Sequence, residues 1–62
     1  MIKTTKFEIL RNVAGQFYWR YKASNGEIVA VSEAYTTKES CKNGIDSIKN
    51  GALFAEIEDL TI

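Results

Sequence analysis

An Asn-Gly dipeptide between two alternating runs constrains the fold of this 62-residue chain more than any other feature. Asn25-Gly26 supplies at low cost the positive φ angles that both central positions of a type I′ turn require. The residues before and after it, 16–24 and 27–31, alternate in polarity as strands do. A two-residue turn sets the register Ser24 with Glu27, Ala23 with Ile28, Lys22 with Val29, Tyr21 with Ala30 and Arg20 with Val31. An antiparallel hairpin is therefore predicted.

The alternation assigns these side chains to two faces of a sheet. Residues 5–10 have the same period of two and are predicted to form a preceding strand, joined by a turn at residues 11–15. The predicted core face carries Phe7, Ile9, Phe17, Trp19, Tyr21, Ala23, Ile28 and Ala30. The opposite face carries Tyr18, Arg20, Lys22, Val29 and Val31.

A helix is predicted after the hairpin. Thr36 and Glu39 fit a capping box, in which the Thr hydroxyl accepts from the Glu amide and the Glu carboxylate reaches back. Asn50-Gly51 is a usual helix end. The apolar stripe of this helix consists of Cys41, Gly44, Ile45 and Ile48. Because Gly44 costs ~1 kcal/mol relative to Ala in a helix, we expect the helix backbone to lie close to Trp19 or Tyr21.

A last strand is predicted at residues 53–58, where Leu53, Ala55 and Ile57 share one side and Leu60 and Ile62 prolong the alternation. The element order is then β-β-β-α-β. We predict an α+β fold, an antiparallel sheet packed by one helix, with residues 1–62 forming a single domain.

The length of the chain limits the stability of one copy. At 7.0 kDa, folding buries about 6,000 Å², worth on the order of 90 kcal/mol if about 60% of that surface is apolar. Ordering the chain at ~1.5 kcal/mol per residue also costs on the order of 90 kcal/mol. Small domains in this position add disulfides, a structural metal or a partner chain. One Cys and no His exclude an internal disulfide and a thiolate-imidazole zinc site, which leaves pairing of two copies.

Charge and hydropathy exclude several partners. Eight basic and eight acidic residues give a formal charge of zero, so no global basic field gathers nucleic acid. The longest charge-free run, residues 12–19, is far shorter than the roughly 20 residues that span a bilayer. The first residues do not follow the pattern of a secretory signal. We expect a cytoplasmic protein that does not bind membranes.

Few residues are candidates for catalysis or metal binding. Cys41 could act as a nucleophile, but the chain has no His to activate it, so we expect a core thiol. The acids Glu33, Glu56, Glu58 and Asp59 match no metal-binding loop and are expected to be solvated. The four glycines suit turns, a packing contact and a cap rather than a phosphate loop. We therefore expect no catalytic residue, no metal and no cofactor.

The face bearing Tyr18, Arg20 and Lys22 is the candidate contact surface. A flat sheet with an aromatic ring and two cations can stack bases and hold phosphates, as single-strand binders do. The alternative is an ordinary exposed sheet face, on which Arg20 and Lys22 pair with Glu8 or Glu27. We favour the second interpretation because a net charge of zero disfavours a strong phosphate binder.

Four segments together resemble the YegP-like family. They are GQFYWRYKA at 15–23, NGEIVA at 25–30, Ser32-Glu33 with Tyr35, and NGIDSIK at 43–49. The resemblance covers residues 5–58 and implies a small, mostly bacterial protein of uncharacterised function. It also implies tandem or paired β-β-β-α-β units that share one sheet with exchanged C-terminal strands. The family often has Gly where this chain has Ala34, and it offers no catalytic residue to carry over.

These expectations combine into one functional hypothesis. We expect a homodimer that acts as a small, non-enzymatic binding or adaptor module, with itself as the one partner that the sequence indicates. The alternative is a weak single-stranded nucleic-acid binder that uses Tyr18, Arg20 and Lys22.

Overall fold

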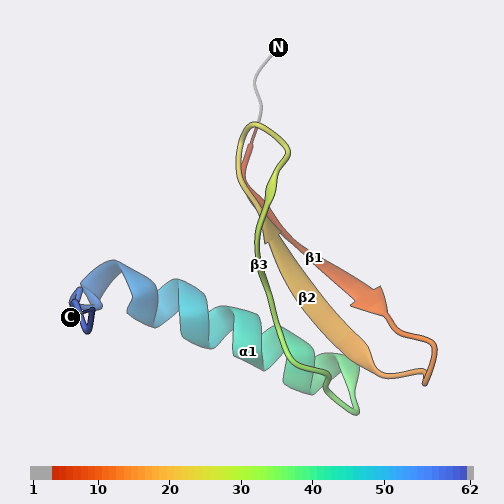
Figure 1. The fold of residues 1–62 in the computed structure, drawn as a ribbon. Helices are drawn as coiled ribbons and strands as arrows, with labels where there is room; N and C mark the ends of the chain where they lie inside the picture. The colour runs from red at the N-terminus through yellow and green to blue at the C-terminus, as the bar shows by residue number, and fades with distance from the viewer. Residues whose placement is uncertain (1–3, 62) are drawn as a thin grey trace.

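The computed structural model describes residues 4–61, which form a three-stranded antiparallel sheet and one long helix (Figure 1). The elements are β1 (Lys6–Arg11), β2 (Phe17–Lys22), β3 (Ile28–Val31), helix α1 (Lys38–Gly51) and the short 3₁₀ helix η1 (Ala52–Phe54). The strands lie in the order β1-β2-β3, and α1 packs against β2. The predicted α+β class is confirmed.

The predicted core face is largely correct. Phe7 pairs with Tyr21 and Ile9 pairs with Trp19, so these four side chains project from the same side of β1 and β2. The Phe7 ring meets Trp19 edge to face, with centroids 5.2 Å apart, and lies 5.0 Å from Tyr21. Trp19 is only 8% exposed, which makes it the centre of this small core.

The turn between β2 and β3 differs from the predicted type I′ turn. Gly26 has a φ of 89°, but Asn25 has no positive φ, so the dipeptide does not supply two left-handed residues. The Gly26 N–H donates to the Ala23 carbonyl at 2.9 Å, and the Ala23 N–H donates to the Glu27 carbonyl at 2.9 Å. The connection is therefore a three-residue turn that ends in a left-handed glycine, the next most common hairpin loop.

This longer turn changes the register beside it. Tyr21 pairs with Ala30 as predicted, but a bulge follows, and Lys22 pairs with Ile28 rather than with Val29. Ile28 was predicted on the core face opposite Ala23. It lies opposite Lys22 instead and is 50% exposed.

Helix α1 begins one residue later than predicted. Its N-cap is Thr37, whose Oγ1 accepts a hydrogen bond of 3.0 Å from the Ser40 N–H. Thr36 is not the cap, so Glu39 does not close a capping box. Glu39 still lies in the first turn, where a carboxylate interacts favourably with the helix dipole.

Gly44 brings the helix close to the sheet, as predicted. A Cβ built at Gly44 would lie 3.5 Å from Trp19 Nε1 and 3.0 Å from Tyr35 Cζ, and it would overlap the Tyr35 hydroxyl. Tyr35 reaches this position because its backbone exchanges two hydrogen bonds with Phe17 at the start of β2. Cys41, one helical turn before Gly44, is fully buried, so the prediction of a core thiol is confirmed.

The last strand is not formed in the described chain. Helical conformation continues through Gly51, whose φ is −104°, into η1, and no strand is assigned to residues 55–61. This segment lies at the far end of α1, away from the sheet (Figure 1). The large apolar side chains of residues 53–60 are 78–98% exposed, namely Leu53, Phe54, Ile57 and Leu60. A strand needs a neighbouring strand for its backbone hydrogen bonds, and these residues have none within residues 4–61.

Candidate functional site

Four charged side chains gather on the sheet face opposite Trp19. We call Lys6, Glu8, Arg20 and Lys22 the Glu8 cluster. Arg20 Nε donates to Glu8 Oε1 at 2.6 Å, while Lys6 Nζ and Lys22 Nζ lie 3.4 Å and 3.9 Å from Glu8 Oε2. The pairing of β1 with β2 places Glu8 opposite Arg20 and Lys6 opposite Lys22. Two of the three predicted contact residues, Arg20 and Lys22, are thus joined through one carboxylate.

The Glu8 cluster carries an excess of positive charge. Three cations surround a single carboxylate, and the hydrogen bond from Arg20 holds the Glu8 pKa below its usual value of 4.5. The side chains of Glu8, Arg20 and Lys22 are 24–31% exposed, so they lie along the sheet rather than extending into solvent. Glu8 therefore neutralises this face in part, leaving two positive charges per chain.

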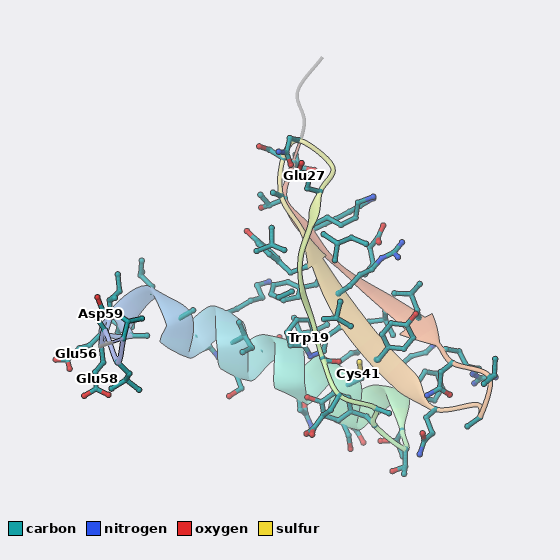
Figure 2. The ribbon with its side chains drawn as sticks, viewed as in Figure 1. Trp19, Glu27, Cys41, Glu56, Glu58 and Asp59 are labelled. Carbon is teal, nitrogen blue, oxygen red and sulfur yellow. The ribbon has the colours of Figure 1, made fainter. Side chains whose placement is uncertain are left out.

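Tyr18 lies on the same face but outside the ionic contacts. It pairs with Leu10, and its position two residues before Arg20 puts it on the same side of β2. The other acid considered for this face, Glu27, lies at the tip of the β2–β3 hairpin (Figure 2). Within residues 4–61 no ion pair joins Glu27 to Arg20 or Lys22.

A small polar hollow adjoins the Glu8 cluster at the hairpin end of the sheet. We call it the hairpin hollow; its volume is about 270 Å³. It is lined by Thr4, Lys6, Lys22, Ala23, Ser24, Asn25 and Gly26. Both lysines of the Glu8 cluster therefore border an open space that also offers two hydroxyl groups, those of Thr4 and Ser24.

A second, apolar space lies on the core face, between the sheet and the C-terminal half of α1. We call it the apolar groove; its volume is about 400 Å³. Its lining consists of Phe7, Trp19, Tyr21, Ala30, Ile48, Lys49 and Ala52. The buried indole N–H of Trp19 has no hydrogen-bond acceptor in the described structure. The first half of α1 therefore covers the core aromatic residues, whereas the groove beside its second half leaves them accessible to solvent.

The remaining candidates for chemistry lie apart from both spaces. Burial raises the pKa of the Cys41 thiol, which disfavours the reactive thiolate. Glu56, Glu58 and Asp59 lie near one another at the C-terminal end (Figure 2). The Asp59 pKa is lowered by hydrogen bonds from the Thr61 side chain and backbone. Within residues 4–61 no group of His, Cys, Asp and Glu has the arrangement to hold a metal ion.

Two residues matter here in roles that were not predicted from the sequence. Lys6 belongs to the Glu8 cluster, and the alternation of β1, which sets Lys6 and Glu8 opposite Phe7, contained the signal. Tyr35 contacts Gly44 and Phe17, but it lies outside any alternating run, so no periodic signal marked it.

No helix within residues 4–61 has the length and apolar character to cross a membrane.

Comparisons with known proteins place the chain in a family. Residues 12–59 match the model of the domain of unknown function DUF1508. The UPF0339 protein Atu5359 of Agrobacterium fabrum is 48% identical over 56 residues, 90% of each chain. The solution structure of a protein from Haloferax volcanii is 35% identical, with a TM-score of 0.80 over 95% of this chain and 98% of that one.

A third relative connects the chain to the predicted family. The UPF0339 protein YegP of Yersinia pestis is 34% identical over 58 residues, which are 94% of this chain and 52% of YegP. Relatives occur in bacteria and in archaea, so membership of the family does not identify this chain as bacterial. The chain belongs to the DUF1508 family of uncharacterised proteins, which includes YegP, as its motifs indicated.

Proposed function

We propose that the chain acts as a homodimer and serves as a small, non-enzymatic binding or adaptor module. The observation that carries this proposal is the coexistence of two unsatisfied apolar surfaces. One is the apolar groove, beside the core aromatic residues, and the other is the exposed segment of residues 53–60. Two copies that exchange these C-terminal segments would cover both surfaces at once.

The energy available from such an exchange is large for a chain of this size. Burying one large aliphatic or aromatic side chain contributes ~1.5–3 kcal/mol. The segment exposes four of them, and as a strand it would direct Leu53 and Ile57 to one side and Phe54 and Leu60 to the other. As a strand, residues 53–60 would also find hydrogen-bond partners along an open sheet edge. The lengths of relatives are in keeping with single units and with tandem units, since this chain matches 90% of Atu5359 and 52% of YegP.

The non-enzymatic part of the proposal is supported by the state of Cys41. Its thiol is fully buried and its pKa is raised, so it is poorly suited to nucleophilic attack. A chain with a single cysteine has no internal disulfide that would need an oxidising compartment, in keeping with a cytoplasmic location. The contact surface of the module is the face with Tyr18, Arg20 and Lys22.

The state of assembly tests this proposal directly. Light scattering after size exclusion should give twice the chain mass of 7.0 kDa at micromolar concentration. Ile57→Asp should lower that mass to one chain, because a charge cannot enter the apolar groove without a large desolvation cost. Val13→Asp is the matched control, since Val13 is as exposed as Ile57 but lies in the β1–β2 turn. A folded wild-type monomer would exclude the exchange.

The second candidate function is weak binding of single-stranded nucleic acid. The favouring observation is the excess of two positive charges beside Tyr18, whereas the ion pairs to Glu8 weigh against it. Labelled oligonucleotides should be titrated at several salt concentrations with the wild type and with Arg20→Ser/Lys22→Ser. Each lost phosphate contact should flatten the slope of log affinity against log salt by about 0.7. No binding by the wild type at low salt would eliminate this function.

A further inference from the structure

The pairing of β1 with β2 contains an unfavourable contact that residues 4–61 resolve only in part. Lys6 and Lys22 occupy directly opposed positions on adjacent strands. Like charges in such positions destabilise a sheet, and sequences ordinarily place opposite charges there. The opposition lies on the open face of the sheet, where no packing of the core requires a lysine.

Glu8 relieves this repulsion incompletely. Its Oε1 is taken by Arg20 at 2.6 Å, so the two lysines share Oε2 at 3.4 Å and 3.9 Å. A charge-assisted hydrogen bond between an ammonium group and a carboxylate is about 2.7–2.9 Å long. Both ammonium groups are therefore near the carboxylate without donating a short hydrogen bond to it, and each has three N–H groups to offer.

Both lysines also line the hairpin hollow. The hydroxyls of Thr4 and Ser24 are further donors in its lining, and no carboxylate is among the lining side chains. A water molecule takes about 30 Å³ in the liquid, so a space of about 270 Å³ has room for a tetrahedral oxyanion with water around it. Local sequence preferences tend to be violated at functional sites. The directly opposed Lys6 and Lys22 violate the preference for opposite charges at paired strand positions.

We propose that the hairpin hollow binds a phosphate group, held between the ammonium groups of Lys6 and Lys22 and the hydroxyls of Thr4 and Ser24. The phosphate dianion takes the role of the second carboxylate that the Glu8 cluster lacks. Glu8 stays with Arg20 and keeps the two lysines in place. The site extends the contact surface proposed above by naming the chemistry that it recognises, and it does not depend on pairing of two chains.

Amide chemical shifts of the ¹⁵N-labelled protein test this site. Sodium phosphate should be titrated against the wild type at constant ionic strength, with sodium chloride as the balancing salt. We expect saturable shifts of the Ser24, Asn25 and Gly26 amides. Lys6→Gln and Lys22→Gln should each raise the dissociation constant about tenfold, the effect of losing one charge-assisted contact.

The control variant is Lys42→Gln, on the exposed side of α1, which should leave the dissociation constant unchanged. Amide shifts of β2 and α1 show whether each variant keeps the wild-type fold. Parallel titrations with inorganic phosphate and with phosphoserine distinguish free phosphate from a phosphate monoester as the preferred ligand. Shifts that do not saturate, or dissociation constants unaffected by either substitution at Lys6 or Lys22, would overturn the proposal. Neither result would bear on the dimer, whose mass is measured separately.

Discussion

Replacing Gly44 with Ala should destabilise the fold, although Ala is the better helix former. In a helix interior Ala is favoured over Gly by ~1 kcal/mol. The new Cβ, however, would overlap the Tyr35 hydroxyl and lie 3.0 Å from Tyr35 Cζ. Overpacking of this kind costs ~1–3 kcal/mol, so the variant should lose about 1 kcal/mol in net free energy of unfolding.

Gly51→Ala is the matched control in the same helix. Nothing lies within 4 Å of a Cβ at Gly51, and its φ of −104° suits an alanine. This variant should gain up to ~1 kcal/mol, so the two Gly→Ala changes are expected to shift stability in opposite directions. Urea unfolding followed by the fluorescence of the single Trp measures both, at one fixed protein concentration because the proposed pairing would make stability concentration-dependent.

A double-mutant cycle identifies the cause. Tyr35→Phe removes the oxygen that a Cβ at Gly44 would overlap, so Gly44→Ala should cost less in that background. If Gly44→Ala instead stabilises the protein as much as Gly51→Ala does, the helix does not lie against Trp19 and Tyr35 as described.

Three further predictions follow from the core and the charged face. Trp19→Ala should cost about 3–5 kcal/mol and abolish cooperative unfolding, as judged by circular dichroism; a native-like melt would refute the placement of Trp19 at the centre. Because the Glu8 pKa is lowered by folding, its stabilising effect is present above its usual pKa of 4.5 and is lost as pH falls through the folded-state value. The stability difference between wild type and Glu8→Gln should therefore vanish in acid, and a difference that persists there would contradict the ion pairs. Cys41 should react with a disulfide reagent far more slowly in the native protein than in urea, whereas equal rates would show an accessible thiol.

The sheet faces could be predicted from the sequence because strand alternation is a local signal with a strict period. Shifting a strand by one residue would move Trp19 from the core to solvent, so burial of one face determines the register of β1 against β2. The same alternation correctly placed Tyr18, Arg20 and Lys22 together on the open face. It also implies that Lys6 lies beside them, because Lys6 alternates with Phe7 on β1.

Details that depend on fractions of a kcal/mol were predicted less well. Thr36 and Thr37 are both good N-caps, and the helix uses Thr37, two residues after the Tyr35 that is bound to Phe17 and lies against Gly44. Asn25-Gly26 can form either a two-residue or a three-residue turn, and only the second leaves Asn25 without a positive φ. In both cases two close alternatives are available, and the tertiary surroundings select one.

The C-terminal segment shows a different limit on what the sequence can predict. Alternation at residues 53–58 indicates that one side of the segment is suited to burial, but it carries no information about which chain supplies the covering surface. Within residues 4–61 that side is exposed, and the helix continues through Gly51 although Asn50-Gly51 is a usual stop signal.

The opposed lysines of β1 and β2 are a second departure from local sequence preference, which favours opposite charges at paired strand positions. Each departure costs free energy in the single chain, and each lies next to an open space, the apolar groove or the hairpin hollow. Contacts with a partner at either space would offset that cost, and so the apolar groove and the hairpin hollow are where partners of this protein should be sought.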